Sequence, residues 1–167
     1  PDSAEPAAPL CAGCGSKLAP AALARATAAL PSPARDDVLT TPGDDAAVLR
    51  VGEALQVVTT DHLRAFTEDP ALLARIAAVH AMGDVWAMGA RPQAAFATVI
   101  LPRMTERLQA RMLDEILTAA SETFRAAGAE LAGGHSTMGT ETTLGFTVTG
   151  LLDGPPVTLA GARPGDA

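Results

Sequence analysis

The sequence predicts an α+β domain: a mixed, mostly antiparallel sheet with helices packed on one face. Two runs of β-favouring residues, 46–51 and 55–60, flank a short turn at Gly52, which is typical of a β-hairpin. Apolar residues recur at helical spacing over 105–127, which indicates an amphipathic helix against the core. The expected order is helix, two strands, helix, strand, helix and further strands. This order is not the regular alternation of a doubly wound parallel sheet.

Composition limits the class of protein. The chain has 167 residues, of which 48% are hydrophobic and only 3% aromatic, so we expect one domain with an aliphatic core. A net charge of −7 argues against nucleic acid or an anionic membrane surface as the main partner. We expect a cytoplasmic protein, because no signal peptide or bilayer-length apolar run is visible and two cysteines do not make a disulfide scaffold.

The hairpin gathers acidic side chains. Asp45 precedes its first strand and Asp61 follows its second, and these two ends lie side by side in an antiparallel pair, with Asp44 beside them. Clustered carboxylates repel one another unless a cation lies between them. The pattern therefore predicts Mg²⁺, which commonly binds through few carboxylates together with phosphates. The simpler alternative is that Gly43-Asp44-Asp45 is only a turn that opens a strand.

A further acidic residue stands inside a helix. Asp69-Pro70 indicates the start of a helix that ends at Gly89. Asp84 lies in this mostly apolar helix, one turn after His80, and a carboxylate there needs a partner or a metal. A surface pair of His80 with Asp84 is the simpler interpretation. The buried stripe of the helix should include Leu73, Ile76, Val79 and Ala87.

The other elements follow from the same patterns. We expect a helix at 19–30, a buried strand at 94–101, a short strand at 129–132, a strand at 144–151 and a last short strand at 157–160. The amphipathic helix should bury Leu108, Met112, Leu113, Ile116, Leu117, Ala120 and Phe124.

Cys11 and Cys14 stand in a Gly-rich segment that ends at Lys17, the only lysine of the chain. A lysine there can favour a thiolate or meet a phosphate. Zinc would need further ligands, and the sequence has no second CxxC. A redox CxxC should follow a strand, whereas this one follows a Pro-rich stretch.

Five ordered motifs make the sequence resemble selenophosphate synthetase, also called selenide, water dikinase. This family belongs to the aminoimidazole-ribonucleotide-synthetase-like ATP-binding superfamily, and the similarity runs from Cys11 to about Asp166. The motifs are the Cys/Lys loop at 12–17, the acidic segments at 43–48, 59–61 and 75–92, and the Gly-rich segment at 131–150.

The resemblance implies a role for particular residues. Cys14 would be the catalytic thiol that handles selenide, with Lys17 as the essential lysine beside it. The ligands of Mg²⁺ would be Asp45, Asp61 and Asp84. The nucleotide site would be formed by Lys17, Asp61, Asp84, Gly133, Gly134, His135 and Ser136, with backbone N–H groups facing phosphate. The implied reaction converts ATP, selenide and water into selenophosphate, AMP and phosphate.

The sequence departs from the family pattern at three positions. Ser16 replaces a cysteine, His80 replaces an asparagine, and Met138 stands where a further Mg²⁺-binding aspartate is expected. A methionine does not bind Mg²⁺. Glu141 is the next carboxylate along the chain.

The resemblance also implies partners. It predicts a homodimer through sheet pairing and a C-terminal domain that this sequence lacks. The Pro-rich start suggests a fused flavin-dependent oxidoreductase module before it. We accordingly expect a flexible linker and active-site loop at 1–18, an ATP-binding domain at 19–160 and the start of a linker at 161–167.

Two other functions remain open. One is a related ATP-using enzyme, such as a thiamine-monophosphate kinase or a hydrogenase-maturation dehydratase, which would leave the Cys/Lys loop unexplained. The other is a non-catalytic nucleotide-binding module of a fused oxidoreductase, which Met138 favours.

Overall fold

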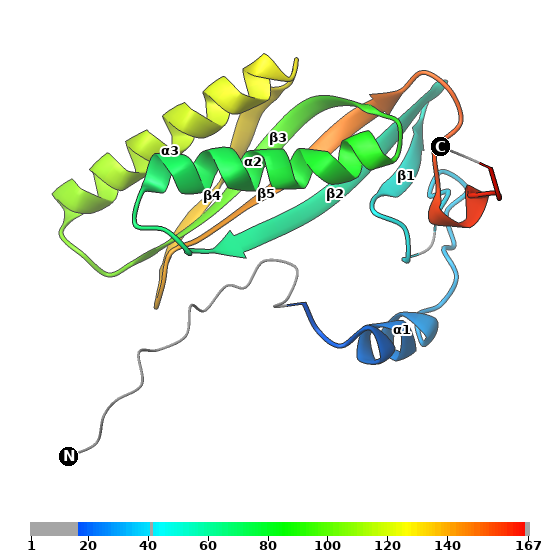
Figure 1. The fold of residues 1–167 in the computed structure, drawn as a ribbon, viewed down its shortest axis with the longest axis horizontal. Helices are drawn as coiled ribbons and strands as arrows, with labels where there is room; N and C mark the ends of the chain where they lie inside the picture. Colours follow the sequence, from blue (N-terminus) through cyan, green and yellow to red (C-terminus); the bar gives the residue numbers. More distant parts are fainter. Residues whose placement is uncertain (1–16, 41, 166–167) are drawn as a thin grey trace.

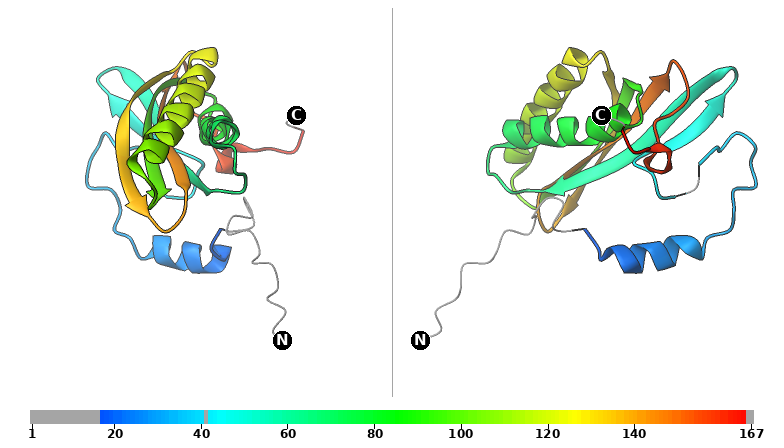
Figure 2. Two further views of the ribbon diagram at one scale, coloured as in Figure 1. Left: turned by 90° about the vertical axis from the view of Figure 1, so that its left-hand side faces the viewer. Right: turned by 45° about the vertical axis from the view of Figure 1, so that its right-hand side comes forward.

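The computed structural model describes residues 17–40 and 42–165. Five strands form one sheet in the order β1-β2-β5-β3-β4, and helices α2 and α3 cover one of its faces (Figures 1 and 2). In chain order the elements are α1 (Pro20–Ala28), β1 (Ala47–Val51), β2 (Ala54–Arg64), α2 (Pro70–Ala87), β3 (Arg91–Pro102), α3 (Glu106–Ala126), β4 (Glu130–Gly139), β5 (Thr143–Leu152) and the 3-10 helix η2 (Leu159–Gly161).

The strand pairing confirms the predicted fold class. β1–β2, β2–β5 and β3–β5 are antiparallel, and β3–β4 is the one parallel pair of the sheet that the structure describes. Parallel neighbours need a crossover, and α3 supplies it between β3 and β4. The sheet is therefore mixed and mostly antiparallel. It places β1 and β4 at its two edges.

The hairpin forms as predicted, but its second strand is longer. β2 continues through Asp61 to Arg64, where the sequence suggested an irregular segment. The reason is its second neighbour, since β5 pairs with β2 along its whole length, from Leu55 opposite Leu152 to Arg64 opposite Thr143. Asp61 thus lies inside a central strand and not after its end.

β4 and the C-terminal segment also differ from the predicted elements. β4 extends to Gly139, because it pairs with β3 as far as Pro102, with one register shift between Ala95 and Phe96. Gly134 permits this pairing, since a Cβ atom at that position would lie 2.2 Å from the carbonyl oxygen of Ala97. The expected short strand at 157–160 is wrong, because this segment forms η2 and pairs with no strand in the part of the chain described.

The boundaries of the long helices match the signals in the sequence. The Asp69 carboxylate accepts hydrogen bonds from the backbone N–H groups of Ala71 and Leu72, at 2.9 and 3.0 Å, and so caps α2. Gly89 after α2 and Gly128 after α3 adopt positive φ values of 77° and 79°. A helix commonly ends at such a glycine.

The core lies between the sheet and the two long helices. Phe124 of α3 contacts Phe146 of β5 edge to face, with ring centroids 5.0 Å apart. Both rings are fully buried. Around them pack aliphatic side chains of every layer: Val57, Leu73, Met82, Val85, Val99, Ile116, Leu144 and Val148. The expected aliphatic core is thus present, with one aromatic pair at its centre.

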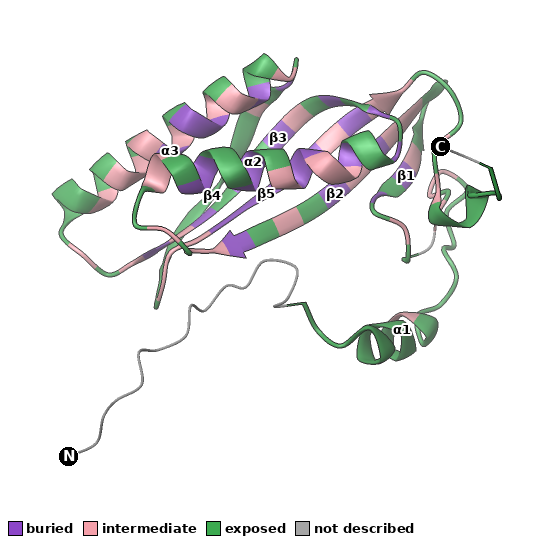
Figure 3. Cartoon of the chain, in the orientation of Figure 1, coloured by how far each residue is buried: buried purple, intermediate pink, exposed green. Residues whose placement is uncertain are grey.

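The observed burial differs from the buried faces predicted for the two long helices (Figure 3). Leu73 is buried, but Ile76, Val79 and Ala87 face solvent. The inward side of α2 is formed instead by alanines together with Leu73, Met82 and Val85. On α3, Leu108 is exposed near the first turn, beyond the residues that meet the sheet. The remaining predicted residues of α3 are buried or half-buried.

Helix α1 stands apart from the two-layer body in every view (Figures 1 and 2). None of its residues is buried. The expectation that helices pack on one face of the sheet therefore holds for α2 and α3. No helix in the described ranges is long and apolar enough to cross a membrane.

Candidate functional site

The acidic residues of β2 and α2 meet where this helix crosses the strand. Thr59 and Asp61 are two residues apart in β2, so both side chains point to the face that α2 covers. The Thr59 hydroxyl donates to Asp84 Oδ2 at 2.7 Å, and His80 Nε2 lies 2.9 Å from Asp61 Oδ2. We call Thr59, Asp61, His80 and Asp84 the acid cluster.

This pairing differs from the simpler interpretation of the helix. His80 contacts Asp61 and not Asp84, although the two helix residues are one turn apart. The strand explains this pairing, because Thr59 and Asp61 both face α2. Thr59 pairs with Asp84, and Asp61 pairs with His80. A carboxylate in an apolar helix was expected to need a partner, and Thr59 is that partner.

The two carboxylates are partly engaged. The second oxygen of Asp61, Oδ1, accepts a hydrogen bond from the His62 backbone N–H at 2.8 Å. The Asp61 side chain is 20% exposed and the His80 side chain 33%. Asp84 is likewise half-buried and is bonded through Oδ2. Both carboxylates are therefore held in place and still open to solvent.

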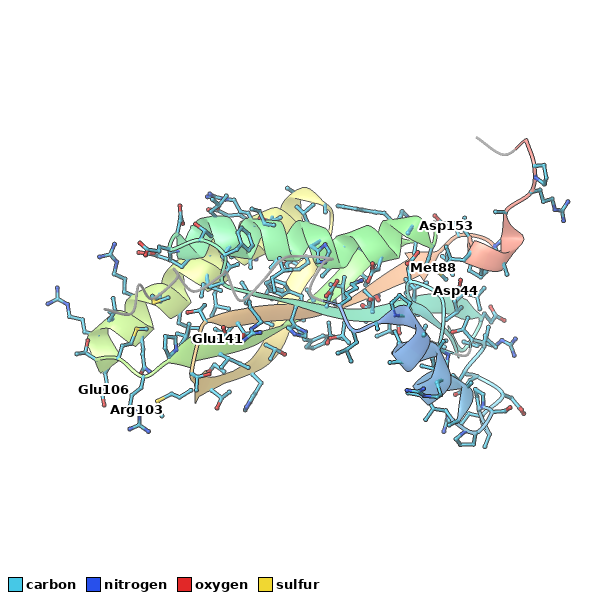
Figure 4. All side chains as sticks on the ribbon, turned by 60° about the horizontal axis from the view of Figure 1, so that its bottom comes forward. Asp44, Met88, Arg103, Glu106, Glu141 and Asp153 are labelled. Carbon is cyan, nitrogen blue, oxygen red and sulfur yellow. The ribbon has the colours of Figure 1, made fainter. Side chains whose placement is uncertain are left out.

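Asp45 lines a cavity together with Thr59 of the acid cluster, whereas Asp44 bonds to the C-terminal segment. Asp45 is exposed and lines a cavity of about 460 Å³ together with Thr59 and Thr60. Asp44 Oδ1 accepts a hydrogen bond from the backbone N–H of Leu159 at 3.0 Å. Asp44 therefore fixes the C-terminal segment beside the hairpin, at the end of the molecule where Met88 also lies (Figure 4).

The Gly-rich segment lies inside β4. Residues 133–136 are all exposed, and β4 pairs with β3 alone among the described strands. The outward backbone groups of an edge strand are free to bond to a ligand or another chain. The same segment lines a cavity of about 350 Å³, whose other wall includes Leu113 and Leu117 of α3.

The structure does not join the acid cluster to this segment. β5 and β3 lie between β2 and β4, and three strand spacings amount to roughly 14 Å. The family resemblance implies that all these residues form one nucleotide site. Within the described chain they form two separate surfaces.

The other predicted residues lie elsewhere. Lys17 is exposed, and Cys14 lies outside the described residues. Met138 is 59% exposed on β4. Glu141 accepts a hydrogen bond from Arg64 Nε at 2.5 Å, so it is paired and not simply a substitute for an acid at position 138.

The carboxylates of the acid cluster fit Mg²⁺ that is also bound by phosphate and water oxygens. No three His, Cys, Asp or Glu side chains within residues 17–40 and 42–165 are close enough to hold a metal by themselves. Mg²⁺ commonly uses one or two carboxylates, with phosphate and water oxygens completing its shell. Asp61 and Asp84 supply that number of carboxylates, both open to solvent.

Thr59 is the site residue that sequence reasoning missed. A signal for it exists, because a residue two before Asp61 in a strand shares its face. Its helix partner was not predictable from spacing, since it depends on how α2 crosses β2.

Comparison with protein families decides the relationship. The family model "AIR synthase related protein, N-terminal domain" matches residues 43–152. The chain belongs to this family. A curated relative is the "Selenide, water dikinase" of Nitratidesulfovibrio vulgaris strain Miyazaki F, which is 41% identical over 161 residues. That match covers 93% of this chain and 45% of the relative, so the chain spans about half the length of the protein it resembles.

Solved structures share the fold. Protein tt0281 from Thermus thermophilus superposes with a TM-score of 0.68 and 26% identity, over 81% of this chain and 44% of that one. Thermotoga maritima PurL complexed with ATP gives a TM-score of 0.58 at 22% identity, over 70% of this chain and 21% of PurL. These structures show the fold, and the family match over residues 43–152 confirms the predicted superfamily.

Proposed function

We propose that this chain is the ATP-binding half of a cytoplasmic enzyme that makes selenophosphate. The reaction is ATP + selenide + water → selenophosphate + AMP + phosphate. The observation that carries the proposal is the acid cluster, in a chain 41% identical to a selenide, water dikinase. Two half-buried carboxylates, each fixed by a neighbour, match what transfer of a phosphoryl group requires of a protein.

Asp61 and Asp84 would hold Mg²⁺ together with the phosphates of ATP, and Asp45 would reach the same ion from the adjoining cavity. The bound ion would spread the negative charge of the phosphates. The contribution of the chain is orientation: Thr59 fixes Asp84, and the His62 backbone N–H with His80 fixes Asp61. Positioned carboxylates lose little freedom when they bind.

Lys17 and Cys14 would act on selenium. Cys14, as a soft thiolate, suits selenide, and Lys17 three residues on favours the ionised thiol. Residues 133–136 would offer backbone N–H groups to phosphate from the free edge of β4. A protein of similar fold, Thermotoga maritima PurL, was solved in complex with ATP, which supports a nucleotide as the ligand here.

The sheet edges support the proposal of a homodimer. In the described chain β1 and β4 each lie at an edge, and either could pair with a strand of a second subunit. Residues 1–18 would then be the active-site loop and linker, 19–160 the ATP-binding domain, and 161–167 the start of the link to a C-terminal domain. A fused N-terminal oxidoreductase module would precede the loop.

Phosphorus NMR of the full-length protein with ATP, Mg²⁺ and selenide under strict reduction tests the proposal. We expect a selenophosphate signal together with AMP. Cys14→Ser should abolish this selenium-dependent turnover and leave ATP binding intact, because the thiol acts on selenium and not on the nucleotide. Cys11→Ser is the matched control and should keep turnover.

Two results would contradict the proposal. ADP with a phosphorylated acceptor other than selenide would make the protein a kinase of the same superfamily. ATP that binds and stays unchanged would make it a nucleotide-binding module without chemistry. Retained turnover in Cys14→Ser would remove Cys14 from its proposed role.

A further inference from the structure

His80 brings a nitrogen donor into the acid cluster. The side chains of the other members, Thr59, Asp61 and Asp84, offer only oxygen atoms. His80 Nε2 lies 2.9 Å from Asp61 Oδ2. Carboxylate oxygens suit Mg²⁺ and Mn²⁺, whereas imidazole nitrogens suit transition cations and are poor partners for Mg²⁺. The cluster therefore combines two kinds of donor that differ in the cations they prefer.

The nitrogen and the carboxylate oxygen are spaced as two ligands of one ion are. Zn²⁺ and Mg²⁺ hold nitrogen and oxygen ligands at about 2.0–2.2 Å, so two ligands at a right angle lie about 3 Å apart. The separation of His80 Nε2 from Asp61 Oδ2 is 2.9 Å. The same spacing suits a hydrogen bond, in which Nε2–H donates because an ionised carboxylate can only accept. His80 is thus placed for either role.

The imidazole ring of His80 can serve both roles without leaving its place. A neutral imidazole has one N–H and one free nitrogen, and either nitrogen can bear the hydrogen. A metal-bound histidine carries its hydrogen on the nitrogen that does not bind the metal. The His80 side chain is 33% exposed, so water can reach the ring. Nε2 can therefore donate to Asp61 beside Mg²⁺, and it can bind a cation that accepts nitrogen.

Regular secondary structure holds the two donors at this spacing. His80 lies within α2, and Asp61 lies within β2, where it pairs with Phe146 of β5. The other oxygen of Asp61 accepts from the His62 backbone N–H at 2.8 Å, which fixes the carboxylate. Sites built on helices and strands are more precise than sites on loops. Fixed geometry and ligand type are the features by which proteins select among divalent cations.

We propose that His80 determines which divalent cation enters with ATP. Its Nε2 joins Asp61 as a ligand of a first-row transition cation such as Mn²⁺, and so raises the affinity of the site for that cation relative to Mg²⁺. Phosphate and water oxygens supply the other ligands, as they do for Mg²⁺. The inference rests on the proposed function, because it concerns the cation that binds together with the nucleotide.

ATP binding to the full-length protein, titrated with Mn²⁺ and with Mg²⁺ in the absence of selenide, tests this role. Mn²⁺ is the probe because cysteine thiolates prefer softer cations, so Cys11 and Cys14 do not compete for it. His80→Asn should lower the ratio of Mn²⁺ to Mg²⁺ affinity about tenfold. An asparagine can still donate to Asp61 but offers no imidazole. An equal loss for both cations would overturn the inference, since His80 would then only position Asp61.

Pulsed EPR of the wild-type protein with Mn²⁺ and ATP gives a second readout that needs no variant. We expect a nitrogen modulation of the Mn²⁺ signal that changes when histidine is labelled with ¹⁵N, which separates it from the nitrogens of adenine, and that disappears in His80→Asn. Cation-dependent ATP binding without a histidine modulation, or a modulation that survives in His80→Asn, would overturn the inference and leave the proposed function standing. ATP binding that is indifferent to both cations would overturn the proposed metal–nucleotide site, and this inference with it.

Discussion

Helices α2 and α3 lie side by side on the same face of the sheet, yet they use their surfaces differently. α3 buries an apolar side that ends in Phe124 and exposes charge on the other. α2 buries alanines together with larger residues such as Met82, exposes other large apolar residues, and carries His80 and Asp84 on the flank that meets β2. The comparison shows that the helix with a clear amphipathic pattern, α3, serves packing alone. The helix without such a pattern, α2, also contributes to the candidate site.

The difference follows from position. α3 is the crossover between two parallel strands, so its task is to cover β3 and β4. α2 crosses β2 and β5 and stands over Thr59 and Asp61. Small residues such as Ala77, Ala78 and Ala81 on its inner side bring it close to the sheet. Short side chains such as those of Thr59 and Asp84 can therefore meet.

The largest expected effect comes from the packing helix. Phe124→Ala removes a fully buried ring that contacts Phe146, and it should lower the free energy of unfolding by about 3–5 kcal/mol. Urea denaturation of this chain measures it. Leu108→Ala on the same helix is the control, and its exposed side chain should change stability by no more than about 0.5 kcal/mol. A small loss for Phe124→Ala would place the core elsewhere.

A smaller effect is expected at the contact of α2 with β2. Thr59→Val keeps the shape of a 7%-exposed side chain but removes the hydroxyl that donates to Asp84, and it should cost about 1.5 kcal/mol. Thr60→Val is the matched control, because it removes a hydroxyl on the other face of the sheet, whose bond from the Thr147 hydroxyl is exposed to solvent. Equal stabilities of the two variants, measured by urea denaturation, would mean that the Thr59–Asp84 bond does not hold α2 in place.

The fold could be predicted from local signals wherever one element decided its own limits. Asp69 and Gly89 bound α2, and Gly128 ends α3, through hydrogen bonding and backbone conformation that the sequence encodes locally. The lengths of β2 and β4 were not predictable in this way. They are set by pairing with β5 and β3, which are distant in the sequence.

The sequence predicted which residue types form the candidate site, but it did not predict which residues contact one another there. The spacing of Asp61 and Asp84 pointed to acidic residues that need partners. Their actual neighbours, His80 and Thr59, depend on the angle at which α2 crosses β2. Exposure of Ile76 and Val79 was also hidden from the sequence, because a helix that is apolar all round does not reveal which side faces the sheet.

Nucleotide binding by the full-length protein, titrated with Mg²⁺, tests the division between the two helices most directly. Asp84→Asn on α2 should weaken Mg²⁺-dependent ATP binding by about tenfold or more, since it removes a proposed charged ligand of the ion while an amide oxygen can still accept from Thr59. Asp114→Asn on the exposed side of α3 makes the same chemical change and should leave the titration unaltered. An unaltered titration for Asp84→Asn, or an equal loss in both variants, would contradict the assignment of the acid cluster as the site of the metal–nucleotide complex.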